Sequence, residues 1–314
     1  METRQLAGGS KISVTPLTLG TWRIGGAPFW APQDSEISVQ AIQTAIGAGI
    51  NCIDTAPVYG MGLAEELIGK AIAGRRDKVV LATKCGLKWK DATIGGIYKD
   101  LTPQSITQEL EDSLKRLGTD RVEIYQIHWP DPATPIADTM NALIKMKEQG
   151  KILEIGVSNF TLEQLQEAIG IAPIACVQPK YNVLEREIEA DLLPFCAQNH
   201  IGVLAYSPLA SGVLSGKYGK DTKFDDWRDG KNFGIFRPET FVKGMDQVER
   251  LKEVAEDYGM TLPQLAIRWL VEQKGVTSAI VGCNNPEQVE ENVTAVSLRI
   301  DSQFLTAIDT ALAG

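Results

Sequence analysis

The chain has 314 residues, of which 44% are apolar and 23% are charged, and its formal net charge is −9. An apolar content of this size is typical of a globular protein with a large core, and the negative charge argues against a nucleic-acid-binding protein. No stretch reaches the roughly 18 uncharged apolar residues of a membrane span, and the first residues lack a secretory signal, which favours a cytoplasmic protein. The five cysteines form no CxxC pair, so neither a disulfide framework nor a metal site is expected.

Short apolar runs alternate with amphipathic segments along the whole chain, which predicts a parallel sheet built from βα units. A hairpin is expected first, from Thr3–Leu6 and Ile12–Val14. Eight strands are then expected at Leu17–Thr21, Cys52–Asp54, Val79–Thr83, Ile124–His128, Ile155–Ser158, Cys176–Gln178, Val203–Ser207 and Ala279–Gly282. Eight strands close a (β/α)8 TIM barrel, and such barrels routinely form one domain of this length, here residues 1–314.

The segments between the strands carry signals for helix ends. Asp34 is expected to cap a helix that Gly49 ends, and Thr102 to cap a helix that Gly118 ends. An open doubly wound sheet, the competing architecture, would carry a G-x-G-x-x-G turn after a strand. The nearest candidate, Gly60–Glu65, has a glutamate at the position of the third glycine. The closed barrel is therefore the prediction.

Two connections after predicted strands are unusually long, Cys85–Thr102 and Pro208–Thr240. Loops of this length without structure of their own tend to be binding loops or lids, and both leave the C-terminal face of the barrel, where active sites lie. The chain stops soon after the last expected helix, Asp301–Leu312, so no long C-terminal segment is expected over the pocket.

Four polar residues with complementary chemistry lie at or just beyond the ends of three consecutive predicted strands: Asp54, Tyr59, Lys84 and His128. Taken singly, each has an ordinary structural explanation, such as a helix cap, a packed aromatic or a solvated strand end. Taken together, an acid, a phenol, an amine and an imidazole at one mouth of a barrel are the groups that protonate a carbonyl oxygen at neutral pH. The pattern therefore indicates an enzyme of carbonyl reduction.

Tyr59 is the expected general acid of this reaction. A free tyrosine has a pKa near 10, about three units too high for efficient proton transfer at pH 7. A protonated Lys84 nearby is expected to lower the pKa of Tyr59, and Asp54 is expected to hold the ammonium charged and oriented. His128 is expected to donate a hydrogen bond to the substrate oxygen.

An ordered series of motifs supports this interpretation. From LGTW at Leu19–Trp22 to the pair Glu291 and Asn292, the series runs DTAPVYG, LATK, IHWP, GVSNF, QPKYN, YSPLASGVLSGKY and VGCNNPEQVEEN. In this order the motifs resemble the aldo-keto reductase family over nearly the whole chain. The likeness is greatest to the bacterial branch of general stress and inositol-cluster reductases, and more distant to potassium-channel β subunits. The resemblance implies a single (β/α)8 barrel that binds NADPH in an extended form without a Rossmann motif.

Carried onto this chain, the resemblance implies a role for each matching residue. The catalytic residues would be Asp54, Tyr59, Lys84 and His128. The nicotinamide and its ribose would contact Thr21, Trp22, Asp54, Ser158, Asn159, Gln178 and Tyr206. The pyrophosphate would lie under a loop that carries Ser207, Leu209, Ser211 and Lys217. The adenosine end would contact Gly282, Cys283, Asn284, Gln288, Glu291 and Asn292.

The adenosine end departs from the family pattern. Many relatives carry arginine or lysine after the glycine that matches Gly282, whereas this chain has Asn284, Asn285 and Gln288. A 2′-phosphate binds best to arginine or lysine, so their loss weakens the preference for NADPH over NADH, although Lys217 can supply one charge. The expected cofactor is NADPH, with NADH as the alternative.

The substrate pocket is expected among aromatic residues on the same face. Its walls would include Trp22, Phe29, Trp30, Tyr59, Trp89, His128 and Trp129. A relatively open pocket with such walls favours small aldehydes, dicarbonyls or sugars.

Four functions are open on the sequence alone. The first is an NAD(P)H-dependent reductase of small-molecule carbonyls, and the second is a sugar dehydrogenase that works in the oxidative direction. The third is a nucleotide-binding regulatory or redox-sensing subunit, as the likeness to channel subunits suggests. The fourth is an isomerase or aldolase that uses Lys84 as a Schiff base. The sequence specifies neither the physiological substrate nor the oligomeric state.

Overall fold

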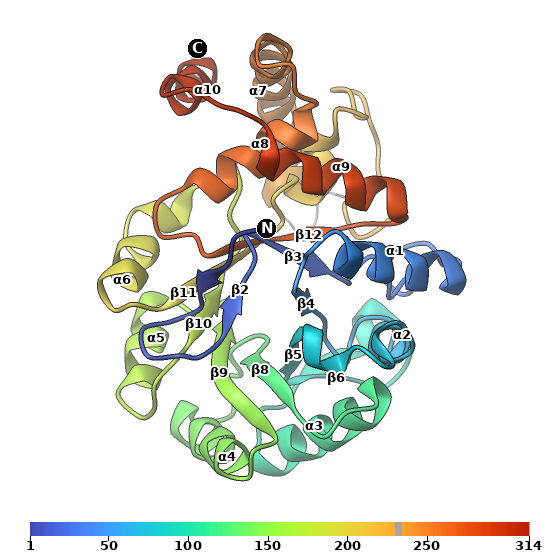
Figure 1. Cartoon of the computed structure of the whole chain (residues 1–314), viewed down its shortest axis with the longest axis vertical. Helices are drawn as coiled ribbons and strands as arrows, with labels where there is room; N and C mark the ends of the chain where they lie inside the picture. Colours follow the sequence, from blue (N-terminus) through green and yellow to red (C-terminus); the bar gives the residue numbers. More distant parts are fainter. Residues whose placement is uncertain (230–233, 314) are drawn as a thin grey trace.

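The computed structural model describes residues 1–229 and 234–313. Eight strands close into a barrel in which each strand is parallel to both neighbours, in chain order (Figure 1). They are β3 (Leu17–Gly20), β4 (Cys52–Asp54), β5 (Val80–Cys85), β8 (Val122–Ile127), β9 (Ile152–Ser158), β10 (Cys176–Gln178), β11 (Gly202–Tyr206) and β12 (Ser278–Gly282). The predicted (β/α)8 barrel is confirmed, which excludes the open sheet.

Helices surround the barrel and cover its outer face (Figure 1). Between barrel strands lie α1 (Ser35–Gly47), α2 (Leu63–Ile72), α3 (Pro103–Leu117), α4 (Ile136–Glu148), α5 (Leu162–Ile169), α6 (Leu192–Gln198), α7 (Pro238–Asp257) and α8 (Leu262–Glu272), and after β12 come α9 (Pro286–Ser297) and α10 (Phe304–Ala313). Because helices cover the strands from outside, a strand such as β8 is buried along its whole length. Both expected caps are present: the Asp34 and Thr102 side chains accept backbone N–H groups of the following turn.

The predicted N-terminal hairpin is confirmed in a shorter form, with β1 (Arg4–Gln5) antiparallel to β2 (Ser13–Val14). Its apolar residues, including Leu6 and Val14, pack against the inward side chains at the start of the barrel strands. The approach is so close that a Cβ atom on Gly202 would overlap the carbonyl oxygen of Leu6. The hairpin therefore closes the barrel at the end opposite the polar strand ends (Figure 1).

The two long connections are not structureless, so that expectation is wrong. In the first, β6 (Leu87–Trp89) and β7 (Ile97–Lys99) form an antiparallel hairpin. In the second, a helical turn spans Ala210–Ser215, another spans Gly234–Phe236, and α7 begins at Pro238; residues 230–233 of the predicted loop lie outside the described part of the chain. Further short helical turns lie at Arg76–Lys78, Ile94–Gly96 and Glu187–Glu189.

Several features bear on the classes of protein that the composition argued against. Within residues 1–229 and 234–313, no helix is long and apolar enough to cross a bilayer. All five cysteines are unpaired and buried. The same residues contain no cluster of three or more histidine, cysteine or acidic side chains that could hold a metal ion.

Candidate active site

The four residues singled out for carbonyl chemistry meet inside the barrel. Lys84 Nζ donates hydrogen bonds to Asp54 Oδ2 at 2.7 Å, to the Thr55 carbonyl at 2.9 Å and to the Tyr59 hydroxyl at 3.2 Å. The rings of Tyr59 and His128 lie edge to face with centroids 5.7 Å apart. Strand β5 runs one residue past Lys84, so this side chain lies within the strand and is fully buried rather than closing the strand.

The burial of Lys84 also bears on the Schiff-base hypothesis. Its Nζ has three oxygen partners and does not line the cavity described below. A carbonyl substrate would have to displace Tyr59 and Asp54 to reach it, which argues against an aldolase or isomerase that uses this amine.

Asp54 is oriented by a buried amide network that the sequence analysis missed. Asp54 Oδ1 accepts hydrogen bonds from Gln178 Nε2 at 2.7 Å and from Gln126 Nε2 at 3.2 Å. Gln126 is fully buried within β8 and also accepts from Gln178 Nε2. The signal available in the sequence was a glutamine in the otherwise apolar run IYQI, because a buried amide requires hydrogen-bond partners.

The electrostatics of the site differ from the expectation for Tyr59. Burial raises the pKa of Tyr59, and the positive charge of Lys84 offsets this only in part, so the net shift is upward. The expected lowering is therefore wrong for the protein by itself, because desolvation outweighs the ammonium. Burial alone would lower the pKa of Lys84, but the charges of Asp54 and Tyr59 raise it, so the ammonium is retained.

His128 is held in its neutral form. Burial, with Lys84 as the second cause, keeps the pKa of His128 well below its ordinary value. Its backbone N–H donates to the Cys85 carbonyl, and its own carbonyl accepts from Asn159 Nδ2 at 2.9 Å. A neutral imidazole fixed in this way carries one N–H that can donate to a ligand oxygen.

The position of Tyr59 is set by a close approach of two loops that the sequence analysis also missed. Gly60 has φ of +64°, and a Cβ atom on it would overlap the carbonyl oxygen of Gly25 in the loop after β3. A Cβ atom on Gly25 would in turn lie 2.5 Å from the Tyr59 carbonyl carbon. Only glycine at both positions lets the backbones touch here.

A cavity of about 930 Å³ opens at the C-terminal ends of the strands. Most predicted site residues line it: Thr21, Trp22, Phe29, Trp30, Asp54, Tyr59, His128, Trp129, Ser158, Asn159, Gln178, Tyr206, Ser207, Leu209, Ser211, Lys217, Gly282, Asn284, Gln288, Glu291 and Asn292. Three do not: Lys84 lies behind Tyr59, Cys283 is buried against Asn292, and Trp89 packs on the cluster around Tyr59.

Strained backbone gathers along the wall of this cavity. Asn159, Ser207 and Ser211 have φ of +59°, +59° and +53°, a region that side-chain-bearing residues rarely adopt. Such residues cost free energy and cluster at ligand sites. Nothing in the sequence signals a left-handed serine, so strain could not have been predicted there.

The lining combines amides and hydroxyls beside Tyr59, which suit a polar ring, with the cationic Arg23 and Lys217, which suit phosphates. Amides and hydroxyls of Ser158, Asn159 and Gln178 gather beside Tyr59, and the Tyr206 hydroxyl donates to Asn159 Oδ1 at 2.9 Å. The volume falls in the range of about 300–1,000 Å³ that small-molecule and cofactor sites occupy. The residues therefore fit a dinucleotide of the nicotinamide type.

Two arginines of the cavity were missed in the sequence. Arg23 Nε donates to Asn284 Oδ1 at 3.0 Å, and its guanidinium lies over the Trp30 ring at 4.7 Å. Arg228 also lies over Trp30, at 5.1 Å, and pairs with Asp226. Arg23 directly follows the aromatic that ends LGTW, which was the available signal; the sequence of the long loop gave none for Arg228.

A cluster of indoles ties the second long connection to the first barrel loop. Trp22 has ring centroids 5.2 Å from Trp30 and 5.0 Å from Trp227, and Trp30 lies 5.1 Å from Trp227. The segment that carries Trp227 therefore packs beside the cavity.

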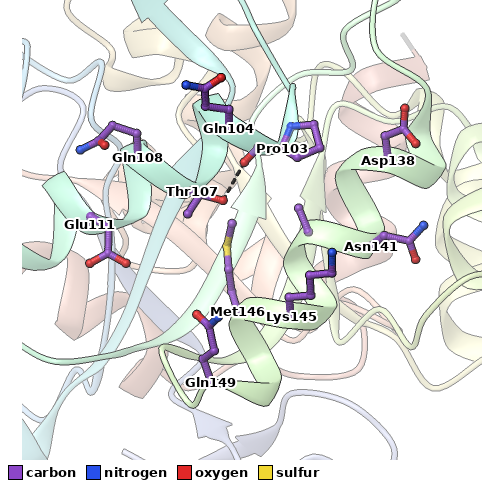
Figure 2. A pocket seen from close by; sticks show the side chains of 11 residues that line it. Pro103, Gln104, Thr107, Gln108, Glu111, Asp138, Asn141, Lys145, Met146 and Gln149 are labelled. Atoms are coloured by element: carbon purple, nitrogen blue, oxygen red, sulfur yellow. Dashed lines mark hydrogen bonds between the residues drawn. The ribbon is translucent and has the colours of Figure 1, made fainter.

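A second hollow of about 600 Å³ lies on the outer face, between α3 and α4 (Figure 2). Its lining is Pro103, Gln104, Thr107, Gln108, Glu111, Asp138, Asn141, Ala142, Lys145, Met146 and Gln149. None of the predicted site residues lies there, so the chemistry belongs to the barrel mouth.

Comparison with known proteins agrees with this geometry. The sequence model of the Aldo/keto reductase family matches residues 16–313. The chain is 38% identical to the aldo-keto reductase YhdN of Bacillus subtilis, over 96% of this chain and 91% of that protein. It is 37% identical to the NADH-specific methylglyoxal reductase of Escherichia coli, over 95% of each. A solved structure of a glycerol dehydrogenase from Gluconobacter oxydans superposes with a TM-score of 0.88 at 38% identity, over 98% of this chain and 94% of that one.

Proposed function

The chain belongs to the aldo/keto reductase family, and from this premise we propose that it reduces small aldehydes and ketones to alcohols with a nicotinamide cofactor, Tyr59 acting as general acid. One observation supports this above all others: the buried Lys84 ammonium lies 3.2 Å from the Tyr59 hydroxyl, beside a neutral His128, at the inner end of a cavity of about 930 Å³.

Tyr59, Lys84 and Asp54 have different roles in the protonation of the substrate oxygen. When bound, the reduced cofactor supplies the hydride that carbonyl reduction needs. The raised pKa of Tyr59, caused by burial, keeps its proton in place at neutral pH until the substrate oxygen gains negative charge. The Lys84 ammonium stabilises the phenolate that remains, and Asp54 keeps that ammonium charged.

His128 and the amide group beside it position the reactants. The neutral imidazole is suited to donate a hydrogen bond to the substrate oxygen, where charge develops in the transition state. Ser158, Asn159 and Gln178 form the amide and hydroxyl group suited to a carboxamide, and Tyr206 offers a ring beside it. Gln178 also donates to Asp54, which couples this group to the proton donor.

For the cofactor we propose NADPH, with NADH as the competing candidate. Arg23 brings a guanidinium to Asn284 at the adenosine end, and Lys217 lines the same cavity, which favours a phosphorylated ribose. Asn284 and Gln288 themselves carry no charge, and one relative is named as NADH-specific. Comparing kcat/KM for the two cofactors decides between them: equal values, or a higher value with NADH, would remove the stated preference.

The proposed substrates are small carbonyls or sugars. The walls near Tyr59 are aromatic, from Trp22 and Phe29 to Trp129, and suit a compact ligand with an apolar face. Two similar proteins, a methylglyoxal reductase and a glycerol dehydrogenase, support three-carbon substrates and also allow the oxidative direction.

A spectrophotometric screen tests the proposal. NADPH and NADH oxidation is followed against a panel of small aldehydes, dicarbonyls and sugars, and NADP⁺ or NAD⁺ reduction against the matching alcohols. Turnover of at least one small carbonyl or alcohol is expected. Failure of the whole panel, together with tight retention of the nucleotide, would instead support a nucleotide-binding regulatory subunit.

A further inference from the structure

The hairpin β6–β7 forms one wall beside the proposed proton donor. Leu87, Trp89 and Ile97 of the hairpin pack against the apolar cluster that contains Tyr59. Leu87 also lines the cavity. The distance between this hairpin and Tyr59 therefore sets the width of the carbonyl pocket.

The hairpin is fastened at its root by a carboxylate from outside the pocket. The backbone N–H of Gly86, the residue before β6, donates to both carboxylate oxygens of Glu109, at 3.1 and 3.2 Å. The Gly86 carbonyl accepts from the backbone N–H of Asp100 after β7. Gly86 has φ of +91°, a conformation that favours glycine, and a Cβ atom on it would lie 2.3 Å from a methyl group of Leu101.

Glu109 is unusual among the acidic residues of the chain. It lies in α3 with 6% of its surface exposed, and among the described residues it forms no ion pair. Its other polar neighbour is the Ser105 hydroxyl, at 3.5 Å. A buried carboxylate that has only neutral partners is costly unless it is protonated.

We propose that Glu109 is a positioning residue for the carbonyl pocket: through its hydrogen bond with Gly86 it holds the hairpin β6–β7 against Tyr59. Only the kinetic consequence of this inference rests on the proposed reductase function. The structural consequence concerns the hairpin itself.

Other titratable groups lie close to Glu109. They are Lys88 on β6, Asp100 before α3, Cys85 on β5 and Tyr125 on β8, and of these only Lys88 is positively charged. Burial raises the pKa of Glu109 to about 7, and the hydrogen bond from Gly86 and the charge of Lys88 offset this only in part.

Three variants test this inference. Glu109→Gln keeps an acceptor for Gly86 but cannot ionise, whereas Glu109→Ala removes the acceptor. Glu111→Gln is the matched control, because Glu111 lies on the same helix but is exposed and pairs with Lys151. Backbone hydrogen exchange of residues 86–101 is measured by mass spectrometry at a single pH, with each variant compared with the natural protein. The exchange of α8 reports any global loss of stability.

The expected pattern follows the hydrogen bond from Gly86. Glu109→Ala should exchange in residues 86–101 roughly threefold or more faster than the natural protein, because it has no acceptor for Gly86, and Glu109→Gln should restore slow exchange. The exchange of α8 should not change in any variant. With methylglyoxal as the probe, the KM of Glu109→Ala should exceed that of the natural protein and of Glu109→Gln, with kcat within about twofold.

The result that overturns the inference is equally specific. Unchanged exchange of residues 86–101 in Glu109→Ala, or exchange in Glu109→Gln as fast as in Glu109→Ala, would show that the hydrogen bond between Glu109 and Gly86 does not hold the hairpin. If no carbonyl is reduced by any form of the protein, the proposed function fails, but the exchange data still decide the role of Glu109.

Discussion

At the scale of single residues, the site combines a phenol that keeps its proton with an imidazole that does not gain one. Burial raises the pKa of Tyr59 and, with Lys84, lowers the pKa of His128. Both side chains are therefore neutral donors near pH 7, and the Lys84 ammonium behind Tyr59 pairs with Asp54 at 2.7 Å. A ligand oxygen that enters this site can accept hydrogen bonds from both donors.

Removing the phenolic oxygen tests the assignment of the acid. Tyr59→Phe is expected to lower kcat for carbonyl reduction by about 10²–10⁴-fold, because a positioned general acid contributes on that order. The Kd of the nicotinamide cofactor, measured by fluorescence titration, should stay within about twofold. Tyr98→Phe, on the exposed edge of the hairpin β6–β7, is the matched control and should leave both values unchanged. Near-normal kcat in Tyr59→Phe would rule out the assignment.

The two pKa directions also predict a pH profile. The raised pKa of Tyr59 means that the phenol stays protonated between pH 7 and pH 9, and the lowered pKa of His128 means that the imidazole is neutral over the same range. With saturating carbonyl, kcat for reduction should therefore be flat between pH 7 and pH 9. A decline within that range would show that the acid in the working complex titrates far lower than in the protein alone.

At the scale of elements, the position of Tyr59 depends on turns and loops more than on strands. Tyr59 lies in the turn between β4 and α2, and its backbone position depends on the contact between Gly60 and Gly25. Glu65, at the start of α2, is fully buried and accepts from Thr83 Oγ1 at 2.6 Å while pairing with Arg116 at 2.7 Å. This pairing explains a glutamate where a dinucleotide fingerprint would have its third glycine: the helix binds an arginine rather than a phosphate.

A pair of glycine substitutions isolates the loop contact from ordinary backbone strain. Gly60→Ala and Gly74→Ala both place a side chain at positive φ, +64° and +75°, which costs about 1–2 kcal/mol of stability in each. Only Gly60→Ala also meets the Gly25 backbone, since nothing lies within 4 Å of a Cβ atom on Gly74. Gly60→Ala should therefore be less stable than Gly74→Ala, and it should lower kcat at least tenfold at a temperature at which both variants are folded. Equal kcat values would show that the contact does not position Tyr59.

The sequence predicted the barrel well because its strands carry a strong signal. Apolar runs bounded by glycine and polar residues marked all eight strands, with ends that differ by at most three residues from the structure. The hairpin β6–β7 was missed because each of its strands has only three residues, too few for a period to show. The meeting of Asp54, Tyr59, Lys84 and His128 was predictable from the strand ends. The direction of the pKa shift of Tyr59 was not, because desolvation depends on packing that only the fold reveals.

At the scale of the whole molecule, the two ends of the barrel have different functions. The end at which the strands start is closed by the N-terminal hairpin and its buried Leu6, and the other end carries the cavity. Stability and chemistry are therefore separated along the barrel axis, as is usual for this architecture.

A substitution in the closed mouth tests this separation. Leu6→Ala should lower the free energy of unfolding in urea by about 2–5 kcal/mol, because it opens a cavity among side chains that are almost fully buried. The kcat for carbonyl reduction should stay within about twofold of normal while the protein is folded. A large loss of kcat with little loss of stability would contradict the separation.

The contact among Trp22, Trp30 and Trp227 gives the protein a built-in optical probe. Three of the six tryptophans of the chain stand together beside the cavity, so their emission reports on whatever enters it. A reduced nicotinamide absorbs in the near ultraviolet, where indoles emit, and would quench them by energy transfer. Ligand capture and loop movement can then be followed in stopped-flow mixing without any attached dye.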